Sequence, residues 1–140
     1  AIMLAGPKRV VHMLAKKELF NSKISNRFFR SMGCIPVDRK IHDDNAKSEA
    51  IEVLKNNEVI GIFPEGTTEK EGHMLRFKKG AVKMAIDTNS PIVPFVITGK
   101  YKLFSKSLTI KFLEPIKCNG DIKEETERLM NIIKKERGKE

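Results

Sequence analysis

The chain has 140 residues, of which 27 are lysine or arginine and 18 are aspartate or glutamate, so its formal net charge is +9. Hydrophobic residues make up 40% of it, which argues against an intrinsically disordered chain and predicts a folded domain of ordinary size. No apolar run approaches the roughly 20 residues that span a bilayer. The basic excess favours an anionic partner, such as nucleic acid, a phosphorylated metabolite or an acidic lipid surface.

Hydrophobic periodicity predicts strands that alternate with helices. In chain order the expected elements are a strand at 10–14, a helix at 20–32, strands at 34–37 and 59–63 around a helix at 44–56, a helix at 80–87, strands at 92–98 and 108–113, and a helix at 121–137. Asp44 or Asn45 is expected to cap the second helix. The residues expected on the inner face of that helix are Ala46, Ala50, Val53 and Leu54, and those expected on the inner face of the last helix are Ile122, Leu129 and Ile133. The strand at 59–63 is continuously apolar apart from Gly61, as expected of a strand buried on both faces. This order predicts an α/β fold, with one domain over residues 1–140 and a mostly parallel central sheet flanked by helices on both faces. The last two strands are expected to pair antiparallel at one edge.

The helix expected at 20–32 has two possible explanations. Its apolar stripe and the basic residues beside it are Phe20, Ile24, Phe28 and Met32, flanked by Lys23, Arg27 and Arg30. A helix that packs on the core is the ordinary explanation. The alternative is a helix that touches lipid while its basic residues meet acidic head groups. Phe28 and Phe29 are adjacent and cannot both face one narrow core, which favours partial exposure.

The cysteines and histidines predict neither a disulfide nor a metal site. Cys34 and Cys118 lie far apart and are expected to be reduced thiols of a cytosolic protein. His12, His42 and His73 do not have metal-ligand spacing with them, so no metal or other cofactor is expected.

Polar clusters follow two of the predicted strands. Glu65 and Gly66 come after the strand at 59–63, and Arg39 comes after the strand at 34–37. Ligands of parallel sheets bind at the carboxyl ends of the strands. Lys78 and Lys79 precede the helix at 80–87, where free amides, the helix dipole and two ammonium groups together favour an anion. The alternative is that these are solvated loop charges, with Glu65 in an ordinary surface ion pair.

Four sequence blocks resemble one enzyme family. The blocks are "GCIPVDR" at 33–39, "FPEGTT" at 63–68, "FKKGA" at 77–81 and "IVPFVITG" at 92–99. In this order and spacing they resemble the 1-acyl-glycerol-3-phosphate acyltransferases, also called lysophosphatidic acid acyltransferases, of phospholipid synthesis. The resemblance extends to about Pro115. It implies transfer of a fatty acyl group from acyl-CoA or acyl-carrier protein, as co-substrate, to the sn-2 hydroxyl of lysophosphatidate.

The resemblance also implies which residues bind the substrate. Arg39 contacts the substrate phosphate, and Glu65, Gly66 and Thr67 belong to the glycerol-3-phosphate block. Thr68 stands where the family usually has arginine, which shifts the phosphate contact onto Lys79 and Arg39 and leaves the exact lysolipid open. The implied partners are a lysolipid, an acyl donor and an anionic membrane surface on the cytoplasmic side. Nucleic acid is not expected.

The family's general base is not found in the sequence. In the family it is the histidine of an N-terminal H-x-x-x-x-D motif. The residues five positions after His12, His42 and His73 are Lys17, Lys47 and Lys78. No catalytic residue is therefore assigned within the chain. We expect an acyltransferase domain that lacks its N-terminal segment and is inactive alone.

Two other functions remain open from the residues. A basic α/β module that binds nucleic acid or another phosphorylated ligand fits the charge, but the chain has one tyrosine and no tryptophan for an aromatic platform. A phosphate-ester or nucleotide enzyme is the other, but the sequence lacks G-x-G-x-x-G and G-x-x-x-x-G-K-[ST] loops.

Overall fold

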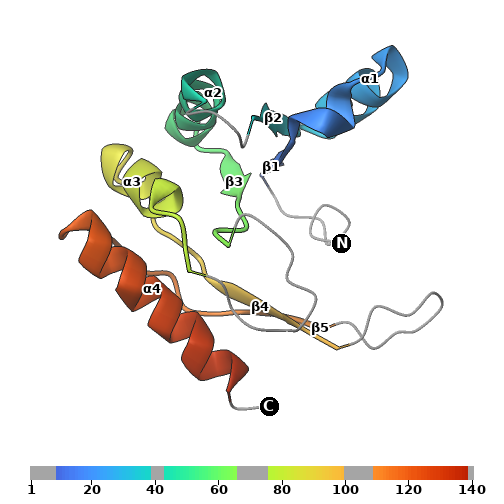
Figure 1. The fold of residues 1–140 in the computed structure, drawn as a ribbon. Helices are drawn as coiled ribbons and strands as arrows, with labels where there is room; N and C mark the ends of the chain where they lie inside the picture. The colour runs from blue at the N-terminus through green and yellow to red at the C-terminus, as the bar shows by residue number, and fades with distance from the viewer. Residues whose placement is uncertain (1–8, 39–42, 66–75, 100–108, 139–140) are drawn as a thin grey trace. The chain divides into compact units, whose positions relative to one another are not determined.

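The computed structural model describes residues 9–38, 43–65, 76–99 and 109–138 (Figure 1). The chain forms two compact units, an N-terminal unit, Ala1–Phe63, and a C-terminal unit, Pro64–Glu140. Among the described residues, no helix is both long and apolar enough to cross a membrane.

The N-terminal unit is built on a parallel sheet of three strands. These are β1 (Val11–Lys16), β2 (Ile35–Val37) and β3 (Val59–Gly61), in the order β2-β1-β3. Leu14 of β1 is in register with Ile35, and Val11 with Val59. The helical segments η2 (Lys17–Phe20), α1 (Lys23–Ser31) and α2 (Asp44–Lys55) connect the strands. The predicted α/β class and its parallel pairing are confirmed.

Side-chain caps set where the two helices of this unit begin. The hydroxyl of Ser22 accepts a hydrogen bond from the Ser25 amide at 3.0 Å, and the amide of Ser22 donates to the Ser25 hydroxyl at 3.2 Å. This reciprocal cap makes α1 begin at Lys23, three residues later than predicted. The predicted caps of α2 were wrong, because the carboxylate of Asp43 accepts from the Ala46 amide at 3.0 Å and leaves Asp44 inside the helix.

His12 joins two turns of the N-terminal unit. Its Nδ1 lies 3.0 Å from the carbonyl oxygen of Gly33, and its Nε2 lies 2.6 Å from a carboxylate oxygen of Glu58. Gly33 has a φ of +74°, and a Cβ placed there would be 3.1 Å from His12 Nδ1, so the turn requires glycine. Both ring nitrogens of His12 are thus engaged in structural contacts.

The N-terminal core forms between α2 and the sheet. Its buried apolar residues are Val11, Cys34, Ile35, Ala46 and Ala50. The two alanines bring α2 close to β2 and β3, as predicted for the inner face of this helix. In contrast, α1 contributes no buried residue, so core packing, one of the two explanations for this helix, was wrong, and the partial exposure favoured by its adjacent phenylalanines is confirmed.

The third strand is shorter and more exposed than predicted. β3 ends at Gly61, and Val59 and Ile60 are only half-buried, although the apolar run predicted a strand to residue 63 buried on both faces. Phe63 is 52% exposed. Pro64, which has no amide hydrogen for a ladder, follows directly and limits how far a strand can continue.

The C-terminal unit contains α3 (Gly80–Asp87), β4 (Phe95–Thr98), β5 (Thr109–Phe112) and α4 (Ile122–Arg137). The two strands pair antiparallel, as predicted, with Phe95 opposite Phe112 and Thr98 opposite Thr109. They form a two-stranded ladder, and an isolated bridge joins Ile92 to Ile116. The strand predicted at 92–98 begins at Phe95, after Pro94, which has no amide hydrogen to donate.

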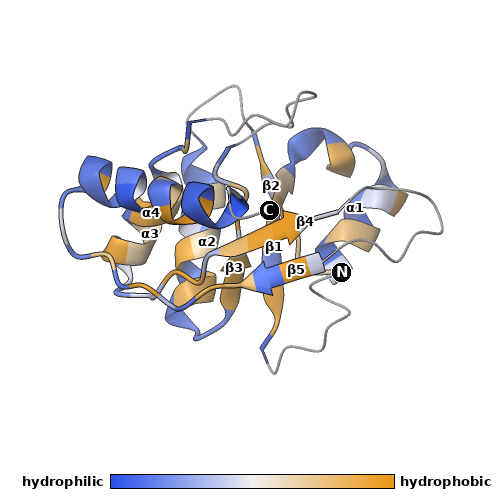
Figure 2. Cartoon of the chain, turned by 90° about the horizontal axis from the view of Figure 1, so that it is seen from below, coloured by the Kyte–Doolittle hydropathy of each residue, from blue (hydrophilic) through white to orange (hydrophobic). Residues whose placement is uncertain are grey.

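The core of the C-terminal unit lies where α3 and α4 run side by side (Figure 1). Its buried cluster is Phe77, Val82, Cys118 and Leu129. Ile122 and Ile133 pack against this cluster, which confirms the predicted inner face of α4. In Figure 2 most of the α4 ribbon has the blue colour of hydrophilic residues. Amphipathic packing therefore fixes the position of α4 in this unit.

Both cysteines are buried free thiols. Burial raises the pKa of the Cys34 thiol and that of the Cys118 thiol, and the nearby Glu125 carboxylate raises the latter further. Both therefore stay protonated and unreactive at neutral pH. The compartment predicted from them stays a prediction.

Candidate active site

The loop that holds the "FPEGTT" block is closed by one hydrogen bond at its base. The amide of Lys78 donates to the carbonyl oxygen of Pro64 at 2.9 Å. Glu65 and Lys79 each come directly after one of these two bonded residues. The bond therefore holds the backbone at these two predicted site residues close together within the C-terminal unit.

The structure describes only some of the predicted site residues. Glu65 is half-buried in a turn, and Lys79 is exposed at the start of α3. Arg39, Gly66 and Thr67 lie outside the described residues, as does Thr68. The structure thus brings the backbone at Glu65 and Lys79 close together, and the roles of all five residues stay predictions.

The N-terminus of α3 differs from the other α-helix starts in the described chain. Ser22, Asp43 and Asp121 cap α1, α2 and α4 with their side chains. At α3 the N-cap residue is Lys79, which makes no side-chain cap, and the first intrahelical bond runs from the Lys83 amide to the Lys79 carbonyl at 2.9 Å. The first amides of this helix and the ammonium groups beside them suit an anion.

Gly80 leaves space in front of this helix start. A Cβ built on Gly80 has no heavy atom within 4 Å, whereas one built on Gly33 meets His12. Packing within the protein therefore does not require glycine at position 80. Glycine here instead allows a ligand to come close to the backbone amides.

Replacing Gly80 with alanine is expected to separate stability from binding. The helix gains about 0.4–1 kcal/mol because alanine restricts the unfolded chain. The added methyl group stands in front of the amides and is expected to weaken the binding of a phosphorylated ligand at least about fivefold. Thermal unfolding and titration calorimetry measure the two effects. Gly138→Ala, at the end of α4, is the matched control and should leave binding unchanged. Equal binding by the two variants would contradict an anion site at the start of α3.

A groove of about 440 Å³ lies beside Lys79 in the same unit. Its lining combines three cations with apolar side chains and comprises Arg76, Phe77, Lys79, Lys123, Thr126, Glu127, Met130 and Asn131. Such a lining suits an amphiphile with an anionic head. Sequence reasoning missed Arg76 and Lys123. The sequence did contain a signal for Arg76, which lies three residues before Lys79. It contained no signal for Lys123, because the packing of α4 brings this residue to the groove.

The cations of this groove affect a neighbouring carboxylate. Hydrogen bonds from the amides of Glu124 and Lys123 hold the pKa of Asp121 below its ordinary value, and the ammonium of Lys79 lowers it further. Lys79 therefore lies near enough to the start of α4 for its charge to act there. The groove begins where α3 and α4 both start.

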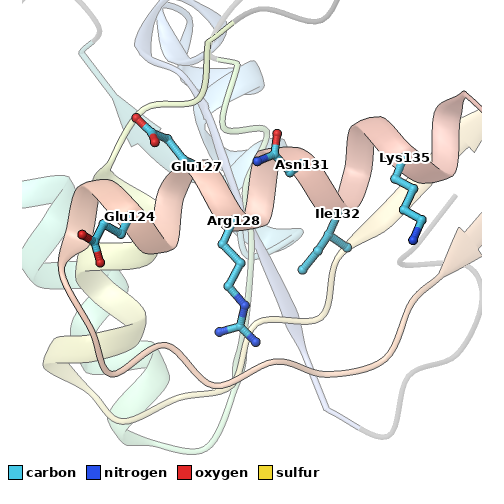
Figure 3. Close-up of a pocket in the computed structure, with 6 residues that line it drawn as sticks. All are labelled: Glu124, Glu127, Arg128, Asn131, Ile132 and Lys135. Carbon is cyan, nitrogen blue, oxygen red and sulfur yellow. The ribbon is translucent and has the colours of Figure 1, made fainter.

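A second depression lies on α4 alone. It measures about 490 Å³ and is lined by Glu124, Glu127, Arg128, Asn131, Ile132 and Lys135. Figure 3 shows these side chains projecting from a single helix and spreading apart. None of them is a predicted site residue, and they do not converge on a common point. We assign no chemistry to this depression.

In the N-terminal unit, Asp43 holds the end of β2. Its carboxylate accepts from the amide of Asp38 at 2.8 Å as well as from that of Ala46. These two hydrogen bonds lower the pKa of Asp43. Lys17 Nζ lies 3.6 Å from the Asp38 carboxylate. The residue that directly precedes Arg39 is thus fixed on two sides.

No metal centre is evident in the part of the chain that the structure describes. No group of three or more histidine, cysteine, aspartate or glutamate side chains there is arranged to hold an ion.

Comparison with known proteins connects these features to a family. The family model described as Acyltransferase matches residues 1–98, a range that includes the blocks at 33–39, 63–68 and 77–81. The 1-acyl-sn-glycerol-3-phosphate acyltransferase of Cocos nucifera is 32% identical over 94% of this chain and 46% of the relative. The enzyme of the same name from Bacillus subtilis is 38% identical over 64% of this chain and 44% of its own length.

A solved structure has the same fold. The crystal structure of the 1-acyl-sn-glycerophosphate (LPA) acyltransferase PlsC from Thermotoga maritima matches with a TM-score of 0.72 and 29% identity, over 90% of this chain and 55% of that one. The chain thus spans about half the length of the relatives it matches. The match to the family model covers well over half of the 140 residues. The chain belongs to the Acyltransferase family.

Proposed function

We propose that this chain is the substrate-head-binding part of an enzyme that transfers a fatty acyl group to the sn-2 hydroxyl of lysophosphatidate. The observation that carries the proposal is the bond from the Lys78 amide to the Pro64 carbonyl, which places Glu65 beside the uncapped start of α3. The relatives that share this region are named as acyltransferases for that substrate.

Each residue of this region has a distinct role in the proposal. The ammonium of Lys79 and the first amides of α3 bind the phosphate. The Glu65 carboxylate accepts a hydrogen bond from the glycerol backbone and orients it. Gly66 and Thr67 belong to the same block, and Arg39 supplies a planar, bidentate phosphate contact.

The reaction is a direct acyl transfer. The sn-2 oxygen attacks the thioester carbonyl, a general base takes the hydroxyl proton, and the C–S bond breaks to release the thiol of coenzyme A or acyl-carrier protein. The donor is a co-substrate, and the proposal includes no further cofactor. The proposal takes the base to be the histidine of an H-x-x-x-x-D motif, as the family resemblance implies, and none of the three histidines present is followed by that aspartate. The enzyme works at the cytoplasmic side of a membrane, where its lipid substrate resides.

An acyl-transfer assay tests this function. The chain joined to an upstream segment that carries H-x-x-x-x-D is expected to acylate 1-acyl-glycerol-3-phosphate, whereas the 140 residues alone give no turnover above background. Under the same conditions, 1-acyl-glycerol without phosphate should react poorly. Equal rates with both acceptors would contradict phosphate recognition, and no acylation of either would contradict the function.

A further inference from the structure

The apolar stripe of α1 lies on the surface of the protein. Ile24 is 85% exposed, Phe28 is 57% exposed and Met32 is 39% exposed. Leu19, in the adjoining η2, is 46% exposed. We call Ile24, Phe28 and Met32, the C-cap residue of the helix, the α1 stripe. Three large apolar side chains on successive turns of one helix are a feature that soluble surfaces seldom keep without a partner.

Contacts on the other sides of α1 fix the direction of the stripe. Arg30 forms an ion pair with Glu49 of α2 at 2.6 Å. At 100° per residue, Arg30 lies about 120° to 160° around the helix from the stripe residues. The ring of Phe29 packs on that of Phe20 in η2, with centroids 5.5 Å apart. The stripe therefore points away from α2, the helix that Arg30 contacts.

The charged residues of α1 itself are all basic. Lys23 and Arg27 lie about 60° to 100° around the helix from Ile24, so they border the stripe on one side. Both are exposed, and α1 contains no acidic residue. An exposed apolar stripe with a basic border is the arrangement of helices that lie in the interface of an anionic bilayer.

We propose that the α1 stripe docks on an anionic phospholipid surface, with Ile24 and Phe28 entering the acyl boundary and Lys23 and Arg27 meeting the lipid phosphates. This docking proposal rests on the proposed function, because lysophosphatidate and its acylated product are both membrane lipids. Charge disfavours a second copy of the chain as the occupant, because each copy brings the same cations and a net charge of +9.

Vesicle co-sedimentation of the 140-residue chain tests the apolar part of the proposal. The chain is expected to bind phosphatidylcholine vesicles that contain phosphatidylglycerol. Ile24→Ser with Phe28→Ser should lower the partition coefficient about tenfold or more, because less apolar surface leaves water. Phe112→Ser is the matched control, since Phe112 is 56% exposed in β5, and its partition coefficient should change less than about twofold.

Charge reversal tests the electrostatic part. Lys23→Glu with Arg27→Glu should abolish the preference for phosphatidylglycerol over pure phosphatidylcholine vesicles. Lys83→Glu with Lys117→Glu changes the net charge by the same amount on exposed positions of the C-terminal unit and should retain that preference. Circular dichroism verifies that each variant is folded.

Three results would overturn the proposal. One is a wild-type chain that does not bind anionic vesicles. Another is that the protein with Ile24→Ser and Phe28→Ser binds anionic vesicles as well as the Phe112→Ser protein does. This holds whether or not those two substitutions also reduce self-association of the chain. The third is that this chain binds anionic vesicles but the protein that carries the H-x-x-x-x-D segment does not. That result would show that the segment covers the stripe.

Acyl transfer to a short-chain, freely dissolved lysophosphatidate separates this proposal from the proposed function. In the catalytically complete protein the stripe variant should keep its rate on that dissolved substrate while it loses vesicle binding. If the wild-type protein binds vesicles but does not acylate the dissolved substrate, that result would contradict the proposed function. It would still support the proposed docking surface.

Discussion

Replacing Glu65 with alanine, in a protein that also carries the H-x-x-x-x-D segment, is expected to lower kcat/KM for lysophosphatidate by about 10- to 100-fold. A hydrogen bond to a charged group contributes about 1.5–3 kcal/mol, which corresponds to this range of rates. Glu65 is half-buried and directly follows Pro64, whose carbonyl accepts the bond from Lys78. The backbone at Glu65 is therefore held in place before the substrate binds.

The control for Glu65 is another glutamate of the same unit. Glu114 is exposed after β5, and Glu114→Ala should change kcat/KM less than about twofold, since surface charges have small effects. Thermal unfolding of the Glu65→Ala protein separates a loss of structure from a loss of substrate contact. Equal kinetic effects of the two substitutions would show that Glu65 has no role in the site.

Replacing Leu129 with alanine is expected to destabilise the C-terminal unit by about 2–5 kcal/mol, the range for truncating a buried leucine. Leu129 is 3% exposed and belongs to the cluster with Phe77, Val82 and Cys118. The cavity left there removes contacts that hold α4 against α3. Since Phe77 and Lys79 line the same groove, ligand binding should weaken along with stability.

Urea unfolding followed by circular dichroism measures this loss. Ile132→Ala is the matched control, because Ile132 is on the same helix but is only half-buried and lines the depression on α4. It should cost clearly less than the change at Leu129. A smaller loss for Leu129→Ala than for Ile132→Ala would contradict the assigned core.

Most of the fold follows from local sequence patterns. The helix at 80–87, the inner face of α4 and the antiparallel pairing of β4 with β5 were all predicted, because apolar spacing and turn residues determine them locally. The start of α1 was not, since Phe20 continues the apolar spacing while the reciprocal Ser22–Ser25 cap places the boundary at Lys23. His12 was also missed as a structural residue, because its partners Gly33 and Glu58 are distant in sequence.

The candidate site was only partly predictable. Motif blocks identified Glu65 and Lys79. Arg76 lies three residues before Lys79 but is in none of the blocks, and Lys123 joins Lys79 only through the packing of α4. The stripe of α1 shows the limit of periodicity, because a four-residue spacing predicts an apolar face without indicating what covers it. In the structure that face is exposed, so core packing was the wrong one of the two explanations.

The most direct test of the central claim, that Glu65 and the start of α3 hold the lysophosphatidate head, is an NMR titration of the 140-residue chain. On addition of 1-acyl-glycerol-3-phosphate, the amide resonances of Lys79, Gly80 and Ala81 and that of Glu65 are expected to shift together and to saturate. With 1-acyl-glycerol, which lacks the phosphate, the shifts at α3 should be absent. Shifts confined to α4 residues such as Ile132, or identical shifts with both lipids, would contradict the account.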